Sequence, residues 1–112
     1  MFAQGAGTIM FFEDEKAVED AKAQYAKFAD SFGMFAAHSL GMLQINVWNA
    51  LAEKNIGANL QHYNPLIDEA VKKQWDIPDD WRLVSEMVFG TAVSDPEPVS
   101  KMPGEERVRV YK

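Results

Sequence analysis

The chain contains no cysteine, which excludes a disulfide framework, a thiolate nucleophile and a cysteine-bound metal. Histidine is also scarce, since only two are present. The histidine at position 38 has no carboxylate beside it at metal-ligand spacing, so we expect no metal site. No uninterrupted apolar run exceeds that of residues 9–12, which is far shorter than a bilayer span of roughly 20 residues. No signal-peptide pattern stands at the start, and we expect a cytoplasmic protein that does not enter a membrane.

Positive charge is in short supply too. Lysine and arginine number 11 against 17 acidic residues, so the formal net charge is −6. This balance disfavours a general nucleic-acid binder, which needs clustered basic side chains for phosphate contacts. The length of 112 residues and a hydrophobic content of 47% are typical of one globular domain, which we place over residues 1–112.

Hydrophobic patterning predicts a mixture of helices and strands. Apolar runs predict a buried strand at residues 8–12 and a second strand at 82–89 that Gly90 closes. Helical spacing predicts helices at residues 13–30, 31–55 and 65–75. The proline-rich residues 91–104 are expected to form a loop. The alternation of residues 106–111 predicts a terminal strand, half buried against another element.

The segment at residues 31–55 has an unusual composition for a helix. No charged residue occurs between Ser31 and Ala52, and apolar side chains point in nearly every direction around the helix axis. Such a helix must be covered on nearly all sides. A domain of this size has few places to bury about five helical turns. We therefore expect the helix to lie in a subunit interface or beneath further polypeptide.

The stretch that follows, residues 55–65, concentrates polar groups between a flexible and a rigid position. Gly57 permits backbone conformations closed to other residues, and Pro65 restricts the residue before it. Two interpretations remain open. The stretch is either a connection whose polar groups satisfy its own backbone, or a site that hydrogen-bonds a planar heterocycle through the four side chains between these positions, Gln61, His62, Tyr63 and Asn64.

Two arginines near the end of the chain are candidates for a second kind of contact. Arg107 and Arg109 can neutralise a phosphate through charge-assisted hydrogen bonds, or they can form the exposed polar face of an edge strand. No Ser-His-Asp arrangement and no paired carboxylates stand out, so no catalytic side chain is assigned. An enzyme with such a sequence is expected to rely on a cofactor for its chemistry.

Several motifs, taken together, resemble the nitroreductase family, in the branch of small flavin oxidoreductases related to the yeast fatty-acid-repression-mutant proteins. The most specific is Leu60-Gln61-His62-Tyr63-Asn64-Pro65. Further similarity lies at residues 5–14, which resemble the strand that begins the second half of the family domain, and at residues 38–51, which resemble its long central helix. Residues 75–81, 88–90 and 106–111 also agree with the family pattern.

The resemblance implies an α+β, nitroreductase-like fold with helices on a small sheet, dimeric and carrying FMN at the subunit interface. It implies hydride transfer from NAD(P)H to the flavin and on to a nitroaromatic or quinone in a ping-pong cycle. By position, Leu60, Gln61, His62 and Tyr63 resemble the segment along the flavin ring, and Arg107, with Arg109 as a weaker candidate, resembles the basic residue near the FMN phosphate. The family's terminal segment commonly reaches across to the partner subunit.

The chain corresponds to the C-terminal half of the family domain only. The Arg-rich motif for the FMN phosphate belongs to the other half, and Lys101 is the nearest candidate for a further lysine of the family. The expected partner is therefore a second copy or a missing N-terminal half. Two alternatives remain: a non-catalytic dimerisation remnant that no longer binds flavin, or a longer reading frame in which Met1 is internal.

Overall fold

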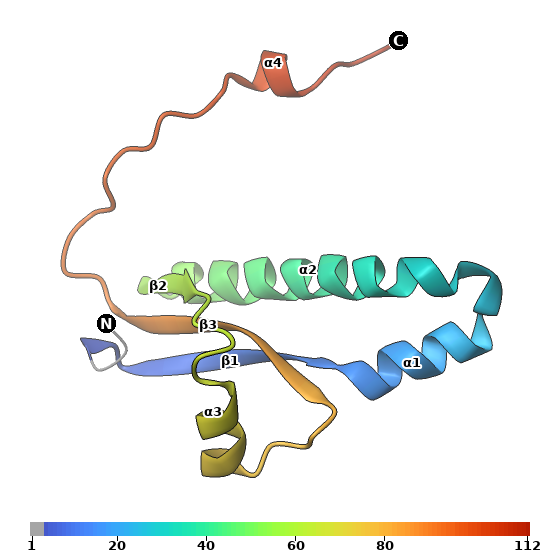
Figure 1. Ribbon diagram of the computed structural model, residues 1–112. Helices are drawn as coiled ribbons and strands as arrows, with labels where there is room; N and C mark the ends of the chain where they lie inside the picture. Colours follow the sequence, from blue (N-terminus) through green and yellow to red (C-terminus); the bar gives the residue numbers. More distant parts are fainter. Residues whose placement is uncertain (1–3) are drawn as a thin grey trace.

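A three-stranded antiparallel sheet organises the molecule, with the strand order β1-β3-β2 (Figure 1). The computed structural model describes residues 4–112. Strand β1 spans Gly7–Asp14, β2 spans Ile56–Gln61 and β3 spans Trp81–Thr91. The central strand β3 comes last in the sequence, and both edge strands pair with it. The prediction of an α+β fold built on a small sheet is confirmed in this arrangement.

Gly90 does not end its strand, contrary to the sequence-based expectation. It lies within β3 and is paired with Gly57 of β2. A Cβ atom at Gly90 would lie 3.1 Å from the backbone nitrogen of Ala6, so the close approach of the N-terminal segment accounts for glycine here. The backbone also contradicts the role expected of Gly57, since the left-handed conformation falls two residues earlier, at Asn55, with a φ of 58°.

The helix predicted over residues 13–30 is shorter than expected at both ends. Helix α1 spans Glu15–Gln24, because Glu13 and Asp14 still pair with β3, and the carboxylate of Asp14 caps the helix by accepting from the Ala17 N–H at 3.1 Å. The helix stops at Tyr25, whose backbone is not helical. A 3₁₀ helix, η2, follows over Ala26–Ser31.

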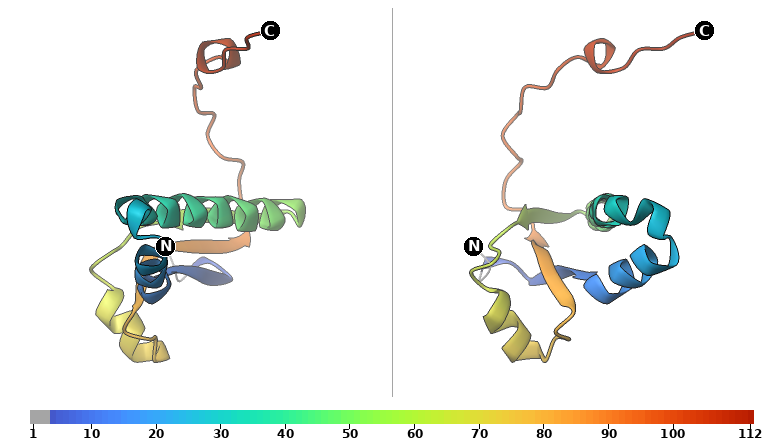
Figure 2. Two further views of the ribbon diagram at one scale, coloured as in Figure 1. Left: turned by 90° about the vertical axis from the view of Figure 1, so that its right-hand side faces the viewer. Right: turned by 45° about the vertical axis from the view of Figure 1, so that its right-hand side comes forward.

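Helix α2 spans Phe32–Glu53, within two residues of the prediction at each end. It lies along one face of the sheet, as two further views show (Figure 2). Its inward side packs Leu40 against Phe11 of β1 and Met87 of β3. Around this buried cluster lie partly buried side chains from all three strands and from α2: Ile9, Val47, Trp48, Leu51, Ala58, Leu60 and Val84. Burial of apolar surface between helix and sheet therefore holds the two layers together.

The opposite side of α2 is apolar and exposed within the single chain. Its exposed apolar residues are Met34, Phe35, Met42, Leu43 and Ile45, and Leu43, for example, is 51% exposed. We call this set the outer surface of α2. Five large apolar side chains exposed on one helix make this side a candidate interaction surface. The sequence predicted that the helix is covered on nearly all sides. Within this chain, the sheet covers only one side of it.

The other face of the sheet carries α3, which spans Asp68–Trp75 (Figure 2). The helix begins three residues after Pro65, later than predicted, because residues 64–67 form turns. Leu66, in the turn before the helix, is 86% exposed, and Val71 is the buried residue of the helix.

The C-terminal segment leaves the body of the molecule after β3 (Figure 1). The terminal strand predicted at residues 106–111 is not formed, because no described strand of this chain lies alongside it. Instead a short helix, α4, spans Gly104–Arg107. The apolar side chains that follow, Val108, Val110 and Tyr111, are largely exposed. The predicted loop over residues 91–104 begins after Thr91.

Candidate functional site

The segment Leu60 to Tyr63 lies where β2 ends and the chain turns towards α3. Leu60 pairs with Met87 and packs on the core beneath α2, while Gln61 pairs with Glu86 on the opposite face. The side-chain amide of Gln61 donates to the side-chain oxygen of Asn59. Beyond the strand, His62 is exposed and Tyr63 is 38% exposed. The segment therefore offers an imidazole and a phenol ring at the rim of the sheet.

Glu86 of β3 holds this segment in place through a hydrogen bond to its backbone. The sequence patterns did not indicate this role. Its side chain is 1% exposed, and Oε2 accepts a hydrogen bond from the Tyr63 backbone N–H at 3.1 Å. Since that N–H already has its acceptor, it is not a donor for a ligand. The available signal was the one acidic side chain of β3, which lies between Ser85 and Met87.

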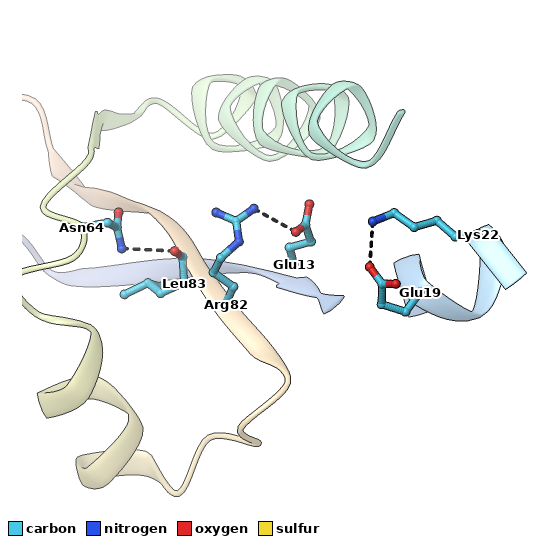
Figure 3. A network of polar contacts seen from close by, with 6 residues as sticks. All are labelled: Glu13, Glu19, Lys22, Asn64, Arg82 and Leu83. Atoms are coloured by element: carbon cyan, nitrogen blue, oxygen red, sulfur yellow. Dashed lines mark hydrogen bonds and ion pairs between the residues drawn. The ribbon is translucent and has the colours of Figure 1, made fainter. Parts of the chain in front are cut away.

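Asn64 anchors the turn in two directions through its side-chain nitrogen. Its Nδ2 donates to Asp68 Oδ1 at 2.8 Å and to the Leu83 carbonyl at 3.2 Å, the latter drawn in Figure 3. The same view shows Arg82 of β3 bound to Glu13 of β1 at 2.8 Å. Asn64 thus ties the turn both to the start of α3 and to the central strand.

Replacement of Asn64 by alanine is expected to destabilise the fold by about 1–3 kcal/mol, because a partly buried carbonyl and a carboxylate lose their donor. Urea unfolding followed by circular dichroism measures this difference. Gln24→Ala is the matched control, since Gln24 is exposed at the end of α1 and its loss is expected to change stability by less than about 0.5 kcal/mol. Equal midpoints for the two variants would contradict the anchoring role.

The two arginines proposed for a phosphate lie elsewhere. Arg107 ends α4 and Arg109 follows it, and both are exposed. Within the described chain neither forms an ion pair with a carboxylate. Figure 1 places α4 well apart from β2. One chain therefore brings Leu60, Gln61, His62 and Tyr63 together, and it does not bring the arginines to them.

Residues 4–112 contain neither a metal-binding cluster nor a membrane-spanning helix. No group of three or more histidine or acidic side chains is arranged to hold a metal ion in this part of the chain. None of the described helices combines the length and apolar character needed to cross a membrane.

Comparison with known proteins places this geometry in context. The model of the nitroreductase family matches residues 1–91. Two proteins of Saccharomyces cerevisiae are similar: HBN1, 40% identical over 90 residues, and the nitroreductase FRM2, 38% identical over 91 residues. These matches cover 80% and 81% of this chain but 46% of each relative, so the chain spans about half their length.

A solved structure extends the similarity to the fold. The nitroreductase CinD from Lactococcus lactis superposes with a TM-score of 0.90 at 45% identity. The superposition covers 94% of this chain and 55% of CinD. CinD has been solved in complexes with nicotinic acid, with 4-nitrophenol and with chloramphenicol.

Proposed function

Because the chain belongs to the nitroreductase family, as its motifs predicted, we propose that it supplies one side of an FMN site in an NAD(P)H-dependent oxidoreductase. The nitroreductase-like fold expected from the sequence is confirmed as well, as a partial domain. The observation that carries the proposal is the segment Leu60 to Tyr63, which carries the most specific family motif and is held at the rim of the sheet by Glu86.

The residues of this chain fit part of such a site. Gln61, His62 and Tyr63 combine an amide, an imidazole and an aromatic ring, a set suited to the edge and face of a flavin ring. Arg107 and Arg109 would hold the phosphate, since both are exposed cations with no carboxylate partner in the described chain. When bound, FMN supplies hydride transfer between NAD(P)H and an acceptor.

We propose a dimer as the assembly that completes the site. The outer surface of α2 supports this proposal, because an apolar surface of this extent gains free energy when a second copy covers it. The extended C-terminal segment supports it as well, since a segment that leaves its own body can carry Arg107 and Arg109 to a neighbouring copy. In such a dimer, each site would combine the rim of one copy with the arginines of the other.

The acceptor that we propose is a small nitroaromatic or quinone. CinD, which is 45% identical, has been solved with 4-nitrophenol bound, and this supports an aromatic acceptor for the family member described here. This chain itself contributes aromatic surface at the rim through Tyr63. No side chain of the chain is assigned a proton-transfer role, because the flavin carries the redox chemistry.

The proposal predicts that the purified protein is yellow, with a flavin band at ~450 nm. Arg107→Ala and Arg109→Ala are each expected to weaken FMN binding about tenfold or more, because a charge-assisted hydrogen bond to the phosphate is lost. Titration of the apoprotein with FMN, followed by flavin fluorescence, measures this effect.

Two controls separate the phosphate contact from other effects. Riboflavin lacks the phosphate, so its binding is expected to be unchanged by either arginine substitution. Lys54→Ala removes another exposed cation and is expected to leave FMN affinity unchanged. Colourless protein that remains without flavin in excess FMN would overturn the proposal and favour the alternative, a non-catalytic interaction module of the same family.

A further inference from the structure

Glu86 brings a buried carboxylate into direct contact with the segment Leu60 to Tyr63. Only 1% of its surface is exposed, and it projects from the face of the sheet that carries α3. Its partners in register are Met10 on β1 and Gln61 on β2. Oε2 accepts the backbone N–H of Tyr63 at 3.1 Å. The carboxylate therefore lies immediately behind the segment that is proposed to line the flavin.

This carboxylate has no counter-charge among residues 4–112. It takes part in none of the ion pairs of the described chain, and Oε1 is buried without a hydrogen-bond partner there. Beside it lies a cavity of about 680 Å³, whose mainly apolar lining includes Met10, Val71 and Trp75. None of the described residues that line this cavity is basic. A charge in such surroundings is screened less than one at the surface, so its field reaches further.

Hydride transfer changes the charge of a flavin ring. The oxidised ring is neutral, and a hydride adds two electrons and one proton to it, which leaves the reduced ring with one negative charge. NAD(P)H, which gives up the hydride, leaves as NAD(P)⁺. A fixed negative charge nearby therefore disfavours the reduced ring relative to the oxidised one. Charge close to the ring is one of the means by which a protein tunes the chemistry of a flavin.

We propose that Glu86 lowers the reduction potential of FMN bound along Leu60 to Tyr63 and so makes the reduced flavin a stronger hydride donor to the acceptor. Glu86 thereby regulates the site of the proposed function, on which this inference rests. Side chains directly opposite on paired strands have Cβ atoms roughly 5 Å apart, so Glu86 lies close behind Gln61. Two unit charges roughly 10 Å apart at an effective dielectric constant of about 20 shift an equilibrium by about tenfold.

The test compares the affinities of the chain for oxidised and for reduced FMN. Glu86→Gln is expected to favour reduced over oxidised FMN about tenfold more than the unmodified chain does, which raises the midpoint potential by about 30 mV for a two-electron couple. Anaerobic reduction in the presence of a reference dye, at mildly alkaline pH, measures this potential. Because glutamine retains an oxygen that accepts the Tyr63 N–H, affinity for oxidised FMN is expected to change less than about threefold.

A second variant adds a charge instead of removing one. Gln74 of α3 lines the same cavity, so Gln74→Lys places a cation near Glu86 and is expected to raise the potential while the contact with Tyr63 stays intact. Gln74→Lys decides the matter if Glu86→Gln fails to fold. Two exposed positions outside the cavity lining provide matched controls. Glu69→Gln and Gln24→Lys make the same charge changes there and are expected to leave the potential unchanged.

Two results would overturn this role of Glu86 and leave the proposed function intact. One is an unchanged potential in Glu86→Gln and Gln74→Lys with FMN bound. The other is an equal loss of affinity for oxidised and reduced FMN in Glu86→Gln, which would show that the side chain only supports the backbone of Tyr63. If the unmodified chain binds no FMN, the proposed function fails and this inference fails with it. The titrations with FMN and riboflavin identify that case separately.

Discussion

Leu43→Asp is expected to convert the proposed dimer into monomers, with the dissociation constant rising about 100-fold or more. Leu43 lies at 51% exposure on the outer surface of α2, among apolar neighbours on the same helix. In a symmetric dimer this substitution introduces two carboxylates into one apolar interface. Desolvation and like-charge repulsion together cost several kcal/mol, and each 1.4 kcal/mol is about a factor of ten.

Sedimentation velocity across a concentration series measures the effect of this substitution. Ala23→Asp adds the same charge at an exposed position of α1 and is expected to leave the dissociation constant nearly unchanged. Circular dichroism is expected to be unaltered by Leu43→Asp, since the side chain lies outside the buried cluster of Phe11, Leu40 and Met87. A Leu43→Asp protein that sediments as the original dimer would refute the assignment of this surface.

Met87→Ala is expected to destabilise the fold by about 2–5 kcal/mol, the range typical of large-to-small substitutions in a core. Met87 is 0% exposed and sits in the central strand, opposite both Ile9 and Leu60. It also belongs to the buried cluster that joins the sheet to α2. A cavity at this point weakens the contact between the two layers, and neighbouring side chains from three elements cannot all move to refill it.

Urea unfolding at one fixed protein concentration measures this loss, because the stability of an associating chain depends on concentration. Met102→Ala provides the matched control, since Met102 is exposed in the C-terminal segment and its truncation is expected to cost less than about 0.5 kcal/mol. Similar unfolding midpoints for both variants would mean that Met87 does not sit at the centre of the core.

The sequence predicted well those elements whose hydrophobic pattern lies within one continuous segment with clear boundaries. Helix α2 departs from its predicted range of 31–55 by at most two residues, because an uncharged, helically spaced segment of this length has few alternatives. Strand β1 was found for a related reason, since its apolar run lies between a glycine-rich segment and acidic residues. The family motif at residues 60–65 drew attention to the segment that lies at the rim of the sheet, although the sequence did not predict strand β2.

The elements that were missed depend on contacts that no local sequence pattern marks. No glycine or proline marks the break at Tyr25, whose ring stacks with that of Phe32 at a centroid distance of 6.1 Å. The alternation at residues 106–111 indicates a strand only where a neighbouring strand exists, and this chain supplies none there. The burial of Glu86 was not predicted, because the sequence of β3 does not reveal which segments pack against each face of the central strand.

The position of β3 in the sequence has a consequence for synthesis on the ribosome. Gly7 of β1 pairs with Phe89, so the nascent chain carries an unpaired first strand until residues 81–91 emerge. At a translation rate of about 5–20 residues per second, that interval lasts roughly 4 to 16 seconds. Until then, Phe11 of β1 and Leu40 of α2 lack Met87, the residue of the central strand that completes their buried cluster. The core of this chain therefore forms only after its last strand has been synthesised.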